Sequence, residues 1–120
     1  MSDDCTYGAA AVNGLLARFG LQGRWCFVDA HGGYHGLSRL RIEHVLKTAD
    51  LFLDMGTHGA WLGEASGGVR VLLDGEPGFN QMKMEKRRSA GEPLPKYDYY
   101  YTAGRNLGTP RSSAPTAGSL

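Results

Sequence analysis

Apolar residues recur along the chain with two different spacings, and each spacing predicts one kind of element. Spacing of three or four residues, which is typical of a helix with one buried face, is found over 5–19, 39–48 and 79–88. Gly20 follows the first of these segments and Pro77 precedes the third, and both residues suit a helix terminus. The sequence therefore predicts three helices.

Short apolar runs alternate with these helices and predict strands. The runs cover 25–28, 50–54, 69–73 and 97–102, and a short helical turn is expected over 60–65. Segment 69–73 follows a pair of glycines and is almost continuously apolar and rich in β-branched residues, which favours a strand covered on both faces.

The order of these elements predicts the fold class. Helix, strand, helix, strand, short helix, strand, helix, strand implies parallel strands joined by right-handed crossovers, so we expect an α/β, partial Rossmann-like parallel sheet flanked by helices. The chain opens on a helix, without the strand and glycine-rich turn that usually start such a sheet, and this indicates a fragment. From Thr109 the composition shifts to Pro, Ser, Thr, Ala and Gly. We therefore expect a domain over 1–108 and a flexible tail or truncated linker over 109–120.

Composition and charge limit the classes of partner that we expect for this chain. The 120 residues carry a formal net charge of +1, so no strong positive field favours nucleic acid. No apolar run approaches the ~20 residues of a membrane span, and the N-terminus lacks a signal-peptide pattern. Cys5 and Cys26 lack the spacing of a metal site and are expected to be reduced, buried thiols. We expect a cytoplasmic protein with no nucleic-acid partner and no membrane span; its oligomeric state stays open.

The sequence changes abruptly from apolar to polar residues after position 73. Directly after the apolar run 69–73, residues 74–78 supply two carboxylates and two glycines. Because ligands bind at the ends of strands in open parallel sheets, the sequence predicts a binding site there without identifying its ligand.

Six segments, in the same order, resemble a family of bacterial glycosyltransferase-like proteins with the two-domain GT-B architecture. These segments are residues 5–7, 19–21 with 24–25, 35–38, 49–51, 73–81 and 101–108. Two departures bear on the activity. The chain has Asp74-Gly75-Glu76-Pro77 where an Asp-x-Asp-Pro turn is expected, and Arg105 where an acidic residue usually precedes Asn106. The acceptor or the activity of this chain could therefore differ from that of the family.

The resemblance implies that the chain is the N-terminal, acceptor-side domain of a GT-B-type enzyme. That enzyme would transfer a sugar from a nucleotide-sugar donor to an acceptor, and the chain alone, without the donor-binding domain, is expected to be inactive. Proteins of this kind generally work without a metal or another cofactor, and we expect none, because an Asp74-x-Glu76 pair alone is too common to indicate a metal site. The alternative is a non-catalytic ligand-binding or interaction domain of flavodoxin-like topology.

Within that resemblance, three loops that follow strands are expected to meet at one sheet edge. His58, Asp74 and Glu76 are candidates for the catalytic base that removes the proton of the acceptor hydroxyl. Each also has a structural interpretation: His58 as an ordinary loop histidine, Asp74 as a helix cap, and Glu76 as a favourable charge at a helix start. The expected substrate-binding residues are Gly56, Thr57, Gly75, Gly78, Gly104, Arg105 and Asn106.

Overall fold

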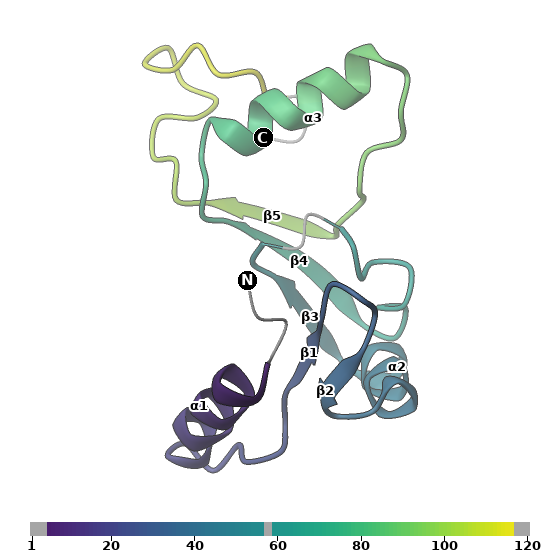
Figure 1. Cartoon of the computed structure of the whole chain (residues 1–120). Helices are drawn as coiled ribbons and strands as arrows, with labels where there is room; N and C mark the ends of the chain where they lie inside the picture. Colours follow the sequence, from purple (N-terminus) through teal and green to yellow (C-terminus); the bar gives the residue numbers. More distant parts are fainter. Residues whose placement is uncertain (1–4, 57–58, 117–120) are drawn as a thin grey trace. The chain divides into compact units, whose positions relative to one another are not determined.

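The computed structural model describes residues 5–56 and 59–116, and its chain forms two compact units (Figure 1). Unit 1 comprises Met1–Val45 and unit 2 comprises Leu46–Leu120. Among the described residues, no helix is long and apolar enough to cross a membrane.

Unit 1 consists of a helix and a β-hairpin. Helix α1 (Thr6–Ala17) is followed by β1 (Cys26–Val28) and β2 (Tyr34–Gly36), which pair antiparallel with Phe27 opposite His35. The side-chain oxygen of Asn13 on α1 accepts hydrogen bonds from the indole N–H of Trp25 at 3.1 Å and from the Gly23 backbone N–H at 3.2 Å. One polar side chain of the helix therefore fixes the segment that leads into the hairpin.

The hairpin corrects the expectation that segment 25–28 belongs to the parallel sheet. The chain turns back between Asp29 and Gly33, where the Asp29 N–H donates to the Gly33 carbonyl at 2.9 Å and Gly32 has φ +81°. Such a short connection permits only antiparallel pairing, because a parallel crossover needs a dozen or more residues. The strand β2 was not predicted, since its three residues form no apolar run.

Helix α2 (Arg39–Thr48) begins in unit 1 and ends in unit 2. It leads into a three-stranded parallel sheet in the order β3 (Leu51–Asp54), β4 (Val69–Asp74), β5 (Tyr99–Thr102). Helix α3 (Phe79–Ser89) connects β4 to β5, and residues 59–65 form turns. The α/β class, with a parallel sheet flanked by helices, is therefore confirmed and is consistent with a partial Rossmann-like fold.

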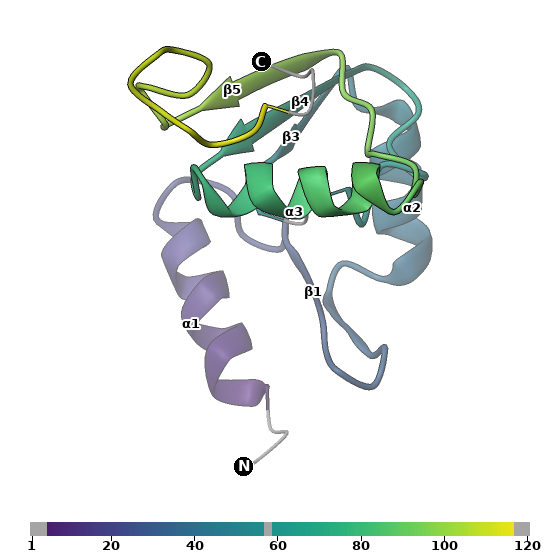
Figure 2. The same cartoon turned by 90° about the horizontal axis from the view of Figure 1, so that it is seen from above.

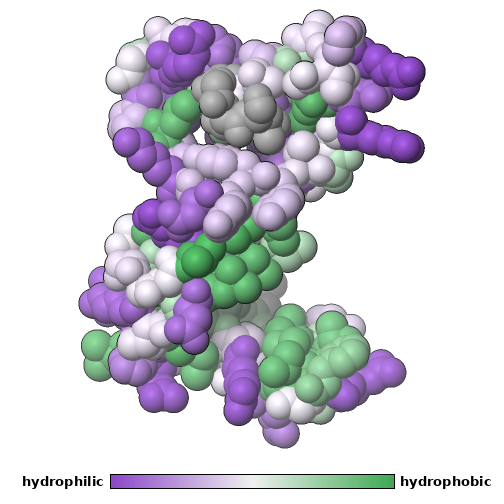
Figure 3. All heavy atoms as spheres, turned by 180° about the vertical axis from the view of Figure 1, so that it is seen from behind, coloured by the Kyte–Doolittle hydropathy of each residue, from purple (hydrophilic) through white to green (hydrophobic). Residues whose placement is uncertain are grey.

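The two faces of the parallel sheet differ. Leu72 on one face is buried against the residues of α3, which runs alongside the strands (Figure 2). On the opposite face, Val71 is buried, but its apolar neighbours are about half exposed, and Figure 3 shows hydrophobic surface over the strands of unit 2. These neighbours are Leu51, Leu53, Val69, Tyr99 and Tyr101. The face of the sheet towards α3 is therefore the better covered of the two.

Candidate functional sites

The strand β3 ends in Asp54, whose side chain is 1% exposed. Its carboxylate accepts hydrogen bonds from the backbone N–H of Gly56 at 3.1 Å, from the N–H of Gly59 at 2.9 Å and from the Tyr97 hydroxyl at 2.6 Å. Burial, followed by the hydrogen bond to Asp54, raises the pKa of Tyr97 far above its usual range. The Tyr97 hydroxyl therefore keeps its proton and ties the segment before β5 to the end of β3.

The strand β4 ends in Asp74, which is 5% exposed and has both carboxylate oxygens occupied. Oδ1 accepts from the Glu76 backbone N–H at 3.0 Å and from the Asn80 amide at 2.5 Å. Oδ2 accepts from the Gln81 amide at 2.7 Å and from the Thr102 hydroxyl at 3.0 Å. Burial alone would raise the pKa of Asp74, but the hydrogen bonds, led by that of Gln81, outweigh it and lower the pKa.

This environment gives Asp74 a structural task. A general base needs a lone pair directed at the substrate and a pKa near the working pH, whereas Asp74 has a lowered pKa and four donors around it. Nor is Asp74 the N-cap of α3, because that position is occupied by Gly78, whose N–H donates to the Gln81 side-chain oxygen at 2.6 Å. Asp74 instead links the turn after β4, the first turn of α3 and the end of β5.

A pocket of about 240 Å³ lies beside this linkage, where the chain leaves β4 and β5. Its lining includes Pro77 and Gly78 ahead of α3, and Gly104, Arg105 and Asn106 after β5. A Cβ atom at Gly104 would lie 2.6 Å from Pro77 Cβ, so glycine is what allows the two loops to approach. Four of the residues that the sequence nominated for substrate binding therefore line one pocket.

The other nominated residues are placed differently. Gly56 donates to Asp54 at the end of β3, and Gly75 and Glu76 lie exposed in the turn after β4. His58 and Thr57 lie outside the described residues. Their predicted roles stay predictions.

Sequence reasoning missed several polar residues of unit 2 that hold this region together. Asp54 and Tyr97 form one buried pair, and Asn80, Gln81 and Thr102 surround Asp74. The sequence carried one signal for these residues. The apolar segments 50–54 and 69–73 lead to Asp54 and Asp74, and the amides of Asn80 and Gln81 come at the start of the helix that follows Asp74. Asn80 Oδ1 is buried and, among the described residues, accepts no hydrogen bond.

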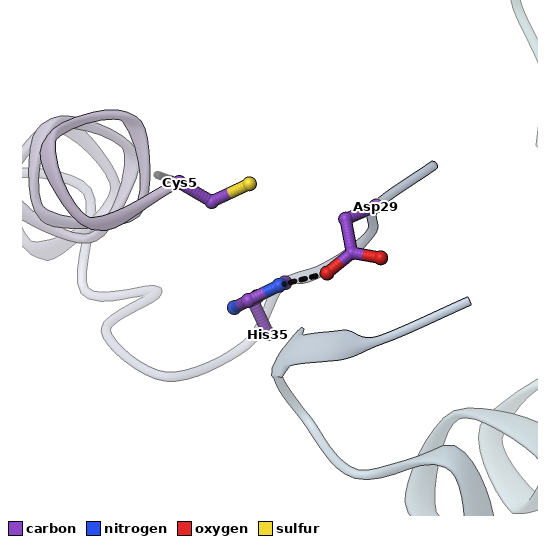
Figure 4. Close-up of side chains that lie close together, drawn as sticks. All are labelled: Cys5, Asp29 and His35. Atoms are coloured by element: carbon purple, nitrogen blue, oxygen red, sulfur yellow. Dashed lines mark hydrogen bonds and ion pairs between the residues drawn. The ribbon is translucent and has the colours of Figure 1, made fainter. Parts of the chain in front are cut away.

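Unit 1 contains a second cluster of reactive side chains, formed by Cys5, Asp29 and His35 (Figure 4). A ligand-type atom of each residue lies within 4.8 Å of those of the other two. His35 Nε2 and Asp29 Oδ2 are 2.8 Å apart, and the other oxygen of Asp29 accepts from the His31 and Gly33 backbone N–H groups at 2.9 and 2.8 Å. The hairpin turn thus holds the carboxylate in position from one side.

The electrostatics of Asp29 follow from these contacts. The hydrogen bond with His35, then the N–H of Gly33, lower the pKa of Asp29 to about 2, against a small opposing effect of burial. A Cβ atom at Gly33 would lie 3.1 Å from the Asp29 carboxyl carbon and closer still to Oδ2, so the carboxylate can fold over the turn only because residue 33 is glycine. Asp29 is ionised at every physiological pH.

An apolar pocket of about 500 Å³ adjoins Cys5 within unit 1. It is lined by Cys5, Gly8, Ala9, Val12, Trp25, Cys26 and Phe27. Both cysteines are partly rather than fully buried, and burial raises the pKa of Cys26. Cys26 is therefore a protonated, largely unreactive thiol at neutral pH, whereas Cys5 stands beside a histidine and a carboxylate.

Comparison of the chain with protein-family models, with curated proteins and with solved structures gave no match. The function of the chain must therefore be inferred from the chemistry of these two sites.

Proposed function

We propose that the chain is the acceptor-side part, over 1–108, of a GT-B-type glycosyltransferase that takes a sugar from a nucleotide-sugar donor in the cytoplasm. The observation that carries the proposal is the pocket of about 240 Å³ between the loops that follow β4 and β5. The carboxyl ends of parallel strands are where α/β proteins bind their ligands. The rest of the enzyme would supply the donor-binding domain.

The lining of the pocket suits a hydroxylated or anionic ligand. Gly78 is the N-cap of the 11-residue helix α3, and the N-terminal end of a helix carries partial positive charge. Arg105 adds a guanidinium group with a rigid fork of donors, and Asn106 adds an amide that can both donate and accept. A sugar with its phosphate groups offers complementary acceptors and hydroxyls.

A second candidate function is a ligand-binding module without catalysis. The saturated environment of Asp74 favours it, because four hydrogen bonds leave this carboxylate without a task in proton transfer. Among the candidate bases within the described residues, only Glu76 is exposed to solvent. The same pocket would then hold a ligand that is not turned over.

The binding site is tested by titrating the chain with glucose 6-phosphate, a hydroxylated and anionic acceptor-type probe, while backbone amide shifts are followed by NMR. We expect saturable shifts at Gly78 and at 104–106. Arg105→Ala should weaken binding about 10- to 100-fold, since a hydrogen bond to a charged group contributes about 1.5–3 kcal/mol. Arg24→Ala, an exposed arginine of unit 1, is the matched control and should leave the affinity unchanged.

Turnover separates the two candidate functions. The product of the complete reading frame that encodes the chain is incubated with UDP-glucose and a panel of alcohols and sugars, and UDP release is measured. Release together with a glycosylated product supports the transferase. Saturable binding of glucose 6-phosphate without UDP release supports the binding module, and an absence of glucose 6-phosphate shifts at 104–106 contradicts both.

A further inference from the structure

Three residues of unit 1 bring three kinds of metal-ligating atom together. Cys5 lies at the N-cap of α1, Asp29 opens the hairpin turn, and His35 lies on β2. Figure 4 shows the three side chains around a common space. Their separations of 24 and 6 residues follow no short metal-binding motif, so the helix and the hairpin, rather than the local sequence, create the cluster.

We propose that Cys5, Asp29 and His35 bind a divalent transition metal ion of the Zn²⁺ class. A thiolate, an imidazole and a carboxylate form a mixed ligand set that suits zinc and its neighbours, whereas Ca²⁺ and Mg²⁺ favour oxygen ligands. The site is independent of the pocket of about 240 Å³ in unit 2, because the two share no residue.

The distances fit a tetrahedral site after small side-chain rotations. Metal–ligand bonds of about 2.0–2.3 Å place neighbouring ligand atoms about 3.3–3.8 Å apart. The three ligand atoms here already lie within 4.8 Å of one another, and His35 Nε2 and Asp29 Oδ2 are 2.8 Å apart. Opening of that hydrogen bond by rotation of the imidazole or the carboxylate makes room for the ion.

The hydrogen bonds that Asp29 accepts from the hairpin turn would hold its carboxylate in position as a metal ligand. Its Oδ1 is held by the backbone N–H groups of His31 and Gly33, which leaves Oδ2 to bind the ion. Such outer contacts orient a ligating carboxylate and raise the affinity of the site. On binding, the Cys5 thiol releases its proton to solvent, and the hydrogen that His35 Nε2 shares with Asp29 leaves to solvent or is exchanged for one on Nδ1. Metal–sulfur and metal–nitrogen bonds then form, with no change of oxidation state.

Three protein ligands leave a fourth coordination position for water or a ligand, as in catalytic zinc sites. Cys5 also lines the apolar pocket of about 500 Å³, so a small molecule in this pocket would lie next to the ion. The second cysteine, Cys26, lines the same pocket but is not a member of the ligand cluster. That difference provides a matched control.

Metal content and cobalt spectra of the whole chain test the site. After loading with ZnCl₂ and desalting, we expect one zinc per chain by mass spectrometry. Loading with CoCl₂ should give a thiolate-to-cobalt charge-transfer band and the visible bands of tetrahedral cobalt. Cys5→Ala should abolish the charge-transfer band, and Cys26→Ala should retain it with full metal content.

Histidine variants test the second ligand. His35→Ala should weaken metal binding at least about tenfold, because loss of even an outer contact costs that much. His31→Ala, which removes a neighbouring imidazole in the same turn, should bind the metal normally. Equal binding by the wild type and Cys5→Ala, or a cobalt spectrum of the wild type without thiolate bands, would overturn the proposal. The cobalt spectrum of the wild type tests for a thiolate ligand without any variant. Misfolding of Cys5→Ala therefore cannot by itself produce the result that supports the proposal.

Discussion

Asp29 in unit 1 and Asp74 in unit 2 share one local arrangement but have different surroundings. Each aspartate follows an apolar strand segment, and each accepts a hydrogen bond from the backbone N–H of the residue two positions later. The distance is 2.9 Å from His31 to Asp29 and 3.0 Å from Glu76 to Asp74. This shared hydrogen bond does not distinguish their roles, since an aspartate at a strand end commonly stabilises a turn in this way.

Their remaining partners separate them. Asp74 is buried, and its other hydrogen bonds come from the amides of Asn80 and Gln81 and the hydroxyl of Thr102, so both of its oxygens are occupied within the fold. Asp29 is partly exposed, and its second oxygen faces His35 beside Cys5. The same local motif therefore serves the fold in unit 2 and offers chemistry in unit 1.

The largest expected effect is that of Asp74→Ala on stability. The substitution leaves three buried or partly buried side-chain donors without their acceptor, and each such donor costs about 1–3 kcal/mol. Because some of them can turn to new partners, we expect a loss of about 3–5 kcal/mol in the free energy of unfolding. Urea denaturation followed by circular dichroism measures it.

Asp50→Ala is the control for this prediction. Asp50 is an exposed aspartate just before β3, and its replacement should change the free energy of unfolding by no more than about 0.5 kcal/mol. If the two variants unfold at the same urea concentration, Asp74 does not organise unit 2, and its contrast with Asp29 is lost.

A smaller effect is expected at the third strand-end aspartate, Asp54. Tyr97→Phe removes a 2.6 Å hydrogen bond from a buried carboxylate while the ring and its edge-to-face contact with Tyr100 are kept. We expect a loss of about 1.5–3 kcal/mol by the same measurement. Tyr99→Phe, at an exposed tyrosine of β5, should have almost no effect; equal losses in both variants would mean that the Asp54 contact contributes nothing specific.

Much of the fold was predictable from local patterns. Helical spacing identified α1, α2 and α3 to within a few residues, and apolar runs identified the three strands of the parallel sheet. The hairpin in unit 1 was missed because β2 is only Tyr34-His35-Gly36, in which nothing apolar repeats. The glycine pair Gly32-Gly33 is typical of a turn but gives no sign of the second strand or of its antiparallel pairing.

The sites were predictable only where a general rule links sequence to position. The rule that loops meet at the ends of parallel strands brought together the loops after β4 and β5, and Gly78, Gly104 and Arg105 do line one pocket. The described residues of the loop after β3, which the rule placed there as well, do not line it. By contrast, the pairing of Asp54 with Tyr97 spans 43 residues, and Cys5 meets His35 only through the packing of a helix on a hairpin. Such long-range contacts depend on tertiary structure, which periodicity and spacing do not specify.

The smallest expected effect, and the sharpest test of the contrast, concerns the pKa of Asp29. The hydrogen bond with His35 is the main reason that this pKa lies at about 2 instead of 3.8. Because the folded-state pKa is lowered, the contribution of Asp29 to the hairpin is complete above about pH 4 and is lost as the pH falls through about 2. Replacement of His35 by alanine should move the pKa of Asp29 back towards 3.8.

Carboxyl ¹³C shifts, followed by NMR between pH 6 and the acid limit of the fold, measure this pKa directly. His31→Ala is the matched control, because residue 31 acts on Asp29 through its backbone N–H, which alanine retains. An Asp29 midpoint that stays the same in His35→Ala as in the wild type would mean that the turn alone controls the carboxylate, as the fixed donors control Asp74. A shift confined to His35→Ala would instead mean that one side-chain partner, which can rotate away, is the main reason that the pKa of Asp29 is lowered.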